Sequence, residues 1–214
     1  MVPAVMTLAL WALLAPSWAG WGGSLPPESG IAKDGISLEA ANALEAKFRA
    51  LLNPDPGSSP SFQPIVITEE EANSYLKYRG LEFLPPGVHD AELHIKSDLV
   101  SGTANVDFAE LNQAGTNADN LFARFLASVL SGKQRVSGSG RLETGNGRAQ
   151  LKIEKVMLGT VEVPEWLVNW MAANYVQKRY DIDLSKPFLL PDHVTRIELS
   201  DGRATLLRRP EGKK

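Results

Sequence analysis

The sequence contains no cysteine and only three histidines. Without cysteine there is no disulfide, no thiolate nucleophile and no cysteine-based zinc site, so an exported chain must be held together by its core alone. The first two histidines, His89 and His94, are five residues apart, which fits neither one face of a helix nor one face of a strand. We interpret both, and His193, as surface or loop residues and expect no metal and no cofactor.

Catalytic motifs are also missing. The sequence has no Gly-x-Ser-x-Gly, no P-loop and no His-Glu-x-x-His. Residues 74–77, SYLK, match Ser-x-x-Lys, but the companion motifs of that enzyme class are absent, so we interpret the match as chance. We therefore expect that the protein is not an enzyme.

Basic residues are slightly fewer than acidic residues. The 214 residues carry a net charge of −3 and are 43% apolar, which is an ordinary globular composition with enough material for one sizeable core. Nucleic-acid-binding proteins normally present a basic face and a recognisable reading motif. We find neither, and expect no nucleic-acid partner.

The first 27 residues have no charge at all. The apolar run 2–15 is shorter than the roughly 20 residues of a membrane span, but it has the length of a signal-peptide core and precedes a small-x-small site, Ser17-Trp18-Ala19. The prediction is a signal peptide over 1–19, cleaved after Ala19, and an extracytoplasmic protein, periplasmic or secreted. The alternative is that the N-terminus stays uncleaved and anchors the protein to a membrane.

Proline and glycine divide the next part of the chain. Residues 20–35 read as a flexible stalk, and 36–52 as an amphipathic helix capped by Ser37 with Leu44, Phe48, Leu51 and Leu52 in its apolar stripe. Residues 53–64 hold four prolines and are predicted to be a linker. The helix is therefore predicted to be a separate docking element, followed by a domain over 65–209 and a basic tail, 210–214.

Local signals predict a capped helix and three hairpins within 65–209. Thr68 and Glu71 form a capping box that starts a helix ending at Gly80. Alternating apolar residues predict hairpins over 91–108, over 134–158 with a turn at Asn146-Gly147, and over 193–208 with a turn at 201–202.

Between the first two hairpins, residues 118–130 have helical periodicity. Phe122, Phe125 and Leu126 share the apolar half of that helix, which we expect to be a lid or a layer packed on a sheet. The alternation of helices and hairpins predicts an α+β fold, in which helices lie on one side of a mostly antiparallel sheet.

Two glycines, Gly138 and Gly140, fall on one face of a predicted strand. Glycine at such positions marks a sharp bend or the close approach of another backbone; the alternative is a bulge near a sheet edge.

Residues 163–180, VPEWLVNWMAANYVQKRY, predict a helix that begins at Pro164. Leu167 and Met171 lie on its apolar half and are predicted to be core, whereas Trp166 and Trp170 lie together just outside that half. The two indoles either face a ligand groove or a membrane surface, or are covered by a second layer such as the helix from residue 38.

Three stretches carry a family resemblance: ITEEEANSYLKYRGLEFLPPGVHDAELHI, IEKVMLGTVEVPEWLVNWM and KPFLLPDHVTRIELSDGRATLL. Over about residues 65–209 the chain resembles small secreted bacterial proteins of the tubular lipid-binding (TULIP) superfamily, the LmeA-like and YpmS-like members. The resemblance implies a curved, mostly antiparallel half-barrel of hairpins wrapped against long helices, with an apolar groove for a phospholipid or another acyl chain. It carries no catalytic residues.

The expected function is therefore non-enzymatic binding of a lipid or a membrane surface in the cell envelope. The ligand-binding residues expected for the groove or its lid are Trp166, Trp170, Phe122, Phe125 and Leu126. The alternative is a structural or protein-binding module of envelope assembly, with no lipid ligand and an envelope protein as its partner.

Overall fold

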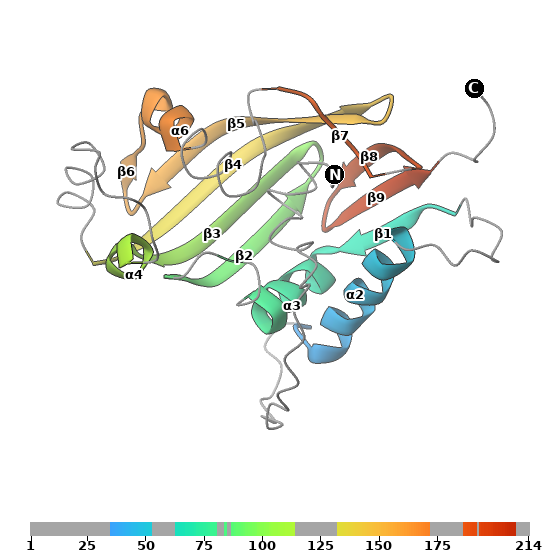
Figure 1. Cartoon of the computed structure of the whole chain (residues 1–214), viewed down its shortest axis with the longest axis horizontal. Helices are drawn as coiled ribbons and strands as arrows, with labels where there is room; N and C mark the ends of the chain where they lie inside the picture. The colour runs from blue at the N-terminus through green and yellow to red at the C-terminus, as the bar shows by residue number, and fades with distance from the viewer. Residues whose placement is uncertain are drawn as a thin grey trace.

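The computed structural model describes residues 35–52, 63–80, 84, 87–113, 132–171, 186–191 and 193–208. Figure 1 shows the arrangement of their helices and strands. In chain order these are α2 (Leu38–Leu52), β1 (Ile65–Thr68), α3 (Glu69–Arg79), β2 (Val88–Lys96), β3 (Leu99–Asp107), α4 (Phe108–Gln113), β4 (Lys133–Gly145), β5 (Arg148–Leu158), β6 (Val161–Glu162), α6 (Glu165–Met171), β7 (Phe188–Leu189), β8 (Val194–Ser200) and β9 (Arg203–Arg208).

The strands form two sheets. A three-stranded sheet has the order β1-β9-β8, and a six-stranded sheet has the order β2-β3-β4-β5-β6, with β7 paired to one end of β5. Every pairing of the described strands is antiparallel. The α+β class and the antiparallel pairing are as predicted. The expectation of one sheet is wrong, because β9 pairs with β1, which lies more than 130 residues before it, and these two strands form a separate sheet with β8.

The three predicted hairpins are β2–β3, β4–β5 and β8–β9. The turn between β4 and β5 is Asn146-Gly147, and both residues have positive φ, 54° and 72°. A two-residue hairpin turn of the primed type requires this left-handed backbone, which is why Asn-Gly predicts it well. The β8–β9 turn, Asp201-Gly202, also places a glycine at φ 72°.

Helix α3 begins with the predicted capping box. The Thr68 hydroxyl accepts a hydrogen bond from the Glu71 backbone N–H (3.1 Å), and the Glu71 carboxylate accepts one from the Thr68 N–H (2.9 Å). Gly80 ends the helix with right-handed angles, φ −53°, so glycine's left-handed freedom is not what stops it here.

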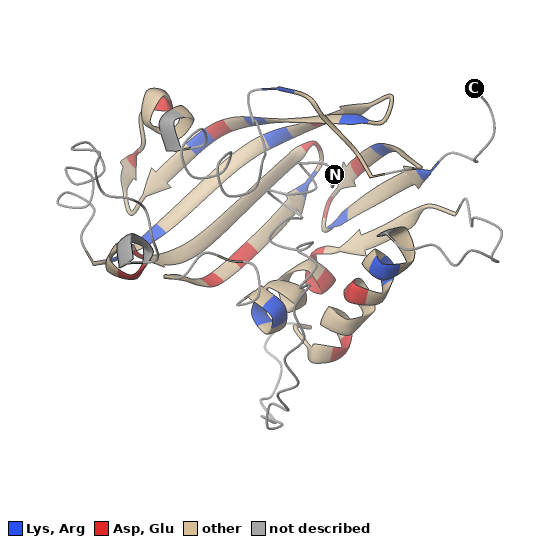
Figure 2. Cartoon of the chain, in the orientation of Figure 1, with Lys and Arg blue, Asp and Glu red and all other residues tan. Residues whose placement is uncertain are grey.

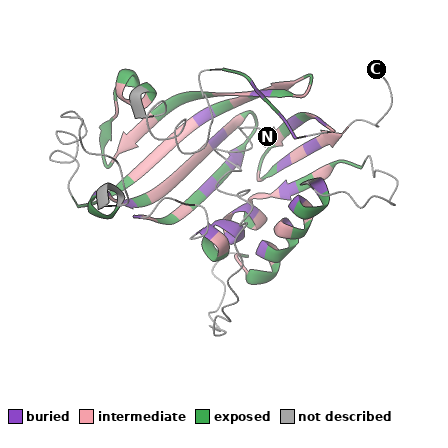
Figure 3. Ribbon diagram, viewed as in Figure 1, coloured by how far each residue is buried: buried purple, intermediate pink, exposed green. Residues whose placement is uncertain are grey.

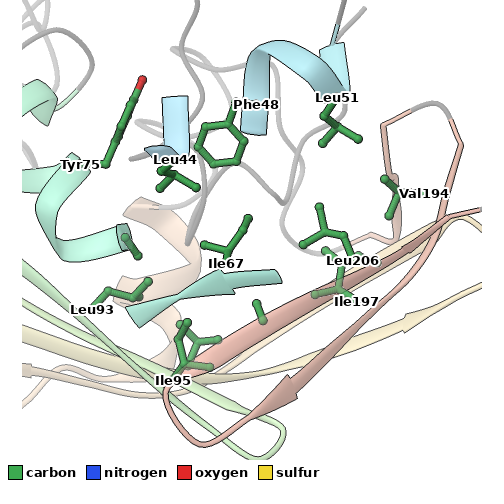
Figure 4. Close-up of a cluster of buried hydrophobic side chains, with 14 of the residues drawn as sticks. Leu44, Phe48, Leu51, Ile67, Tyr75, Leu93, Ile95, Val194, Ile197 and Leu206 are labelled. Atoms are coloured by element: carbon green, nitrogen blue, oxygen red, sulfur yellow. The ribbon is translucent and has the colours of Figure 1, made fainter. Parts of the chain in front are cut away.

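Helix α2 is part of the core and not a separate docking element, which corrects the interpretation of residues 36–52. Leu44, Phe48 and Leu51 are buried (Figure 4). The Phe48 ring contacts the Tyr75 ring of α3 edge to face, with the ring centroids 6.0 Å apart. Lys47 reinforces the contact, because its ammonium donates to the Val66 carbonyl (2.7 Å) and pairs with Glu71. An apolar stripe packs wherever it finds a complementary surface, whatever the composition of the linker beside it.

Side chains of α3 close one edge of the six-stranded sheet. The Asn73 amide donates to the Leu93 carbonyl of β2 (2.8 Å) and accepts from the Leu93 N–H (2.7 Å), as a neighbouring strand would. The Glu69 carboxylate accepts from the Ile95 N–H (2.8 Å), and the Gly202 N–H donates to the Ile95 carbonyl (2.9 Å). At Leu93 and Ile95 the backbone groups on the edge of β2 are thereby satisfied without another strand.

A second set of contacts joins the tip of the β4–β5 hairpin to β8. The Thr144 hydroxyl donates to the Ile197 carbonyl (2.6 Å) and accepts from the Ile197 N–H (3.1 Å). The Gly147 N–H donates to the Thr195 carbonyl (2.9 Å). The two sheets are thus joined on both sides of the core, which lies between them and under α2 and α3 (Figure 4).

Some predictions lie outside the described residues. These are the signal peptide 1–19, residues 20–34 of the stalk, residues 53–62 of the linker, the helix over 118–130, residues 172–180 of the helix predicted over 163–180, and the tail 210–214. Within the described ranges, no helix is long and apolar enough to cross a membrane.

Candidate functional site

The six-stranded sheet has one apolar face. Side chains alternate between the faces of a strand, and residues paired across strands point to the same face. Val100 of β3 is buried in the core and pairs with Gly140 of β4, which pairs with Ile153 of β5. This row therefore belongs to the face that covers the core, which we call the inner face.

The inner face continues beyond the core. The next row is Leu93 of β2, Gly102, Gly138 and Val156, and the row after it is Ala104, Val136, Leu158 and Val161. All these side chains are apolar or absent, and apart from Leu93, which belongs to the core, none of them is fully buried. Ile153 is 39% exposed and Val161 is 67% exposed. Buried residues gather instead around α2, α3 and the three-stranded sheet, whereas β4 and β5 are intermediate or exposed toward β6 (Figure 3).

The two predicted glycines have different roles on this face. A Cβ on Gly140 would lie 2.8 Å from the Lys152 carbonyl, so no side chain fits there. The pairing shifts between Ser139 and Gly140, with Glu154 of β5 as the extra residue, so the bulge and the close approach predicted as alternatives occur together. However, β4 is an inner strand and not an edge.

Gly138 has room above it. A Cβ placed there would meet only ordinary contacts among the described residues, 3.7 Å to the Lys155 carbonyl and 3.9 Å to Val156. Together with Gly102 on the neighbouring strand, it leaves a flat patch of backbone in the middle of the partly exposed inner face. An apolar surface that the described residues leave uncovered has the chemistry that an acyl chain needs.

The opposite face of the same sheet is polar. Ser101, Thr103 and Asn105 of β3 pair with Ser139, Ser137 and Arg135 of β4. Exposed ion pairs join β4 to β5, Arg141 to Glu154 and Lys152 to Glu143. The hydrogen bond and the charge of Glu154 raise the pKa of Arg141, which therefore stays cationic. Acidic and basic residues are interspersed along the described helices and strands (Figure 2).

Helix α6 places Trp166 outside the core. The helix begins one residue after Pro164, whose carbonyl accepts from the Val168 N–H (3.1 Å). Trp166 is 60% exposed, and Leu167, predicted to be core, is only half-buried. The short β6 strand before α6 is held to β5 by the Leu158–Val161 and Met157–Glu162 pairs and by an ion pair between Lys155 and Glu162.

The structure does not describe the side chains of the other predicted site residues. Phe122, Phe125 and Leu126 lie outside the described residues, as does the side chain of Trp170. Helix α2, proposed as a second layer over the indoles, packs on α3 and lies away from α6 (Figure 1). Sequence reasoning also missed the extended inner face. Its signal was the alternation of small apolar residues with polar ones along β3 and β4, which is evident once the register is known.

The described part of the chain contains no cluster of metal ligands. Within those ranges no three histidine, aspartate or glutamate side chains are grouped to hold a metal ion. His89 and His94 are exposed on β2 and meet single carboxylates, those of Glu110 (3.3 Å) and Glu69 (3.0 Å). Each is a surface ion pair when the imidazole is protonated.

Comparison with known proteins assigns no family to the chain. No protein-family model matches the sequence, and the search of curated proteins finds no significant similarity. The chemistry of the inner face of the six-stranded sheet is therefore the basis for any functional conclusion.

Proposed function

We propose that this protein binds a phospholipid or another acyl-chain ligand on the inner face of its six-stranded sheet, without catalysing a reaction. The observation that carries the proposal is the apolar inner face, which runs two residue rows beyond the buried core and stays partly exposed. In this proposal the sheet is the half-barrel of a TULIP-like protein, and the setting is lipid handling in the cell envelope after export.

The energetics favour an apolar occupant. Burial of apolar surface contributes about 25 cal/mol per Å², so an acyl chain lying along Val136, Val156 and Leu158 would be bound mainly by the hydrophobic effect. The patch at Gly102 and Gly138 would let the chain lie close to the backbone. Specificity for a headgroup would need polar groups at the rim, where the β6–α6 end carries the acidic residues Glu162 and Glu165.

Gly138→Leu should lower acyl-chain binding at least about tenfold, because the leucine side chain would occupy the space proposed for the ligand. Binding can be measured by displacement of a fluorescent fatty acid and by native mass spectrometry of lipid retained after purification. Circular dichroism should show that the variant keeps its fold.

The matched control for this experiment is Ser139→Leu. It adds the same side chain to the next residue of β4, on the polar face. If both variants bind like the parent, or both lose binding equally, the ligand does not lie on the inner face. If the parent retains no lipid and binds no fatty acid, a structural or protein-binding module of envelope assembly becomes the better description.

We also propose that the β6–α6 end of the inner face meets the membrane from which a lipid would enter. Val161 lies at the edge of the row that contains Val136 and Leu158, and Trp166 follows it closely in the chain. Both are exposed, and tryptophan favours the boundary between apolar and polar membrane layers. Glu162 and Glu165 flank them, which favours membranes with little negative charge.

Val161→Asp should weaken binding to phosphatidylcholine vesicles about tenfold or more, since it replaces an inserting apolar side chain with a charge. Trp166→Ala should act in the same direction. Vesicle flotation measures the effect, and Leu189→Asp, an equally exposed apolar residue on β7, should leave it unchanged. An equal loss of vesicle binding in all three variants would mean that the membrane contact lies elsewhere on the protein.

A further inference from the structure

The tip of the β4–β5 hairpin is tied to the rest of the protein through the backbone of its turn. The Gly147 N–H donates to the Thr195 carbonyl of β8 (2.9 Å), and the Gly147 carbonyl accepts from the Leu190 N–H after β7 (2.8 Å). We call these two bonds the clasp. Next to them lie Ala149, Leu190 and Val194, all buried, so the clasp lies at the border of the core, while the side chain of Asn146 is exposed.

The same dipeptide is the one most prone to spontaneous deamidation. In that reaction the backbone nitrogen of Gly147 attacks Cγ of Asn146, a C–N bond forms, and the Cγ–Nδ2 bond breaks. The nitrogen leaves as ammonia, taking up the proton of the Gly147 amide, and leaves a five-membered succinimide. Water then opens the ring at one of two carbonyls, giving aspartate or isoaspartate. Glycine permits the attack because it has no side chain to shield its nitrogen.

The clasp blocks the attacking atom. The Gly147 nitrogen can react only after its N–H leaves the Thr195 carbonyl, loses its proton and turns toward Asn146 Cγ. The left-handed angles of Asn146 and Gly147 are set by the hairpin, so this rotation also breaks the bond to Leu190. The net stabilisation by two hydrogen bonds corresponds to about tenfold to a hundredfold in an opening equilibrium.

We propose that Asn146 is a latent modification site, converted to isoaspartate only when the clasp opens, and that its conversion irreversibly loosens the junction between the two sheets. Isoaspartate adds a methylene to the main chain, so a two-residue turn can no longer keep both clasp bonds in register. The modified turn also carries a new negative charge. The sequence contains no other Asn-Gly pair, so no other asparagine is followed by the unshielded nitrogen of a glycine.

The test compares the conversion rate of the folded chain with that of the same chain unfolded in urea, in the same mildly alkaline buffer. Mass spectrometry of the peptide containing Asn146 follows the reaction, and isoaspartyl methyltransferase distinguishes isoaspartate from aspartate. Conversion in the folded chain should be at least about tenfold slower. Equal rates in the two states would overturn the proposal.

A variant tests the gating by the clasp. Thr144→Val removes the hydroxyl that holds Ile197 beside the clasp and should speed conversion severalfold while the chain stays folded. Thr103→Val, on the polar face of β3, is the matched control and should convert like the parent. If Thr144→Val does not fold, conversion of the parent at increasing sub-denaturing urea replaces it and should accelerate before global unfolding. Conversion unaffected by either change would contradict gating.

The consequence of modification has its own control. Deamidated protein, separated from the parent by its added charge and shown by isoaspartyl methyltransferase to contain mainly isoaspartate, should melt below the Asn146→Asp variant, which carries the same charge on a normal backbone. Identical melting temperatures would show that the added methylene does not disturb the clasp and would overturn that part of the proposal.

Discussion

Replacing Leu44 with alanine is expected to lower the free energy of unfolding by about 2–5 kcal/mol. Leu44 of α2 is 0% exposed and lies in one cluster with Ile67 of β1 and Leu206 of β9, which are also fully buried (Figure 4). The substitution removes buried methyl and methylene groups and leaves a cavity that the surrounding strands can fill only in part. Thermal or urea denaturation followed by circular dichroism gives the value.

The control lies on the same helix. Leu38 is 49% exposed at the first position of α2, so Leu38→Ala should change stability by no more than about 0.5 kcal/mol. A Leu44→Ala variant as stable as Leu38→Ala would mean that α2 docks loosely and that residues 36–52 are a separate element after all.

Asn73→Ala should have a comparable effect for a different reason. The Asn73 side chain satisfies both the N–H and the carbonyl of Leu93, which is buried on β2. Alanine would leave these two backbone groups without their partner, and each unsatisfied buried group costs about 1–3 kcal/mol. We expect a loss of about 2–5 kcal/mol in the free energy of unfolding and faster hydrogen exchange at the Leu93 amide.

Asn42→Ala provides the comparison for this variant. Asn42 accepts a hydrogen bond from Arg79 (3.0 Å) at the exposed surface of α2, where water can replace the lost partner. Its loss should cost a few tenths of a kcal/mol. If both variants melt at the same temperature and the Leu93 amide exchanges no faster, Asn73 does not stabilise the edge of β2.

These two predictions concern the part of the molecule where α2, α3 and the three-stranded sheet enclose the core. The proposed ligand surface lies elsewhere, on β4, β5 and β6. The six-stranded sheet extends beyond the residues that α2, α3 and the three-stranded sheet cover (Figure 1). Stability and ligand binding can therefore be tested separately. Core variants should lower the free energy of unfolding, and inner-face variants such as Gly138→Leu should affect binding with the fold retained.

The candidate site was only partly predictable from the sequence. The pattern of α6 indicated that Trp166 lies outside the core, and its high exposure agrees with that placement. The half-buried state of Leu167 was not predicted, because a helical wheel gives the direction of a side chain but not the amount of protein that lies over it. The inner face needed the register of four strands, which no single stretch of sequence contains.

By itself, the sequence determined the features that neighbouring residues decide. The Thr68–Glu71 capping box and the Asn146-Gly147 turn depend on residues at most three apart, and the strands around the turn follow from alternation along the chain. The tertiary structure alone decided which distant segments meet. Asn73 bonds to Leu93 across 20 residues, Thr144 to Ile197 across 53, and β1 joins β9 from the other end of the domain. Such contacts form only when the whole core assembles, because the entropy lost in closing each long loop is offset by many contacts made together.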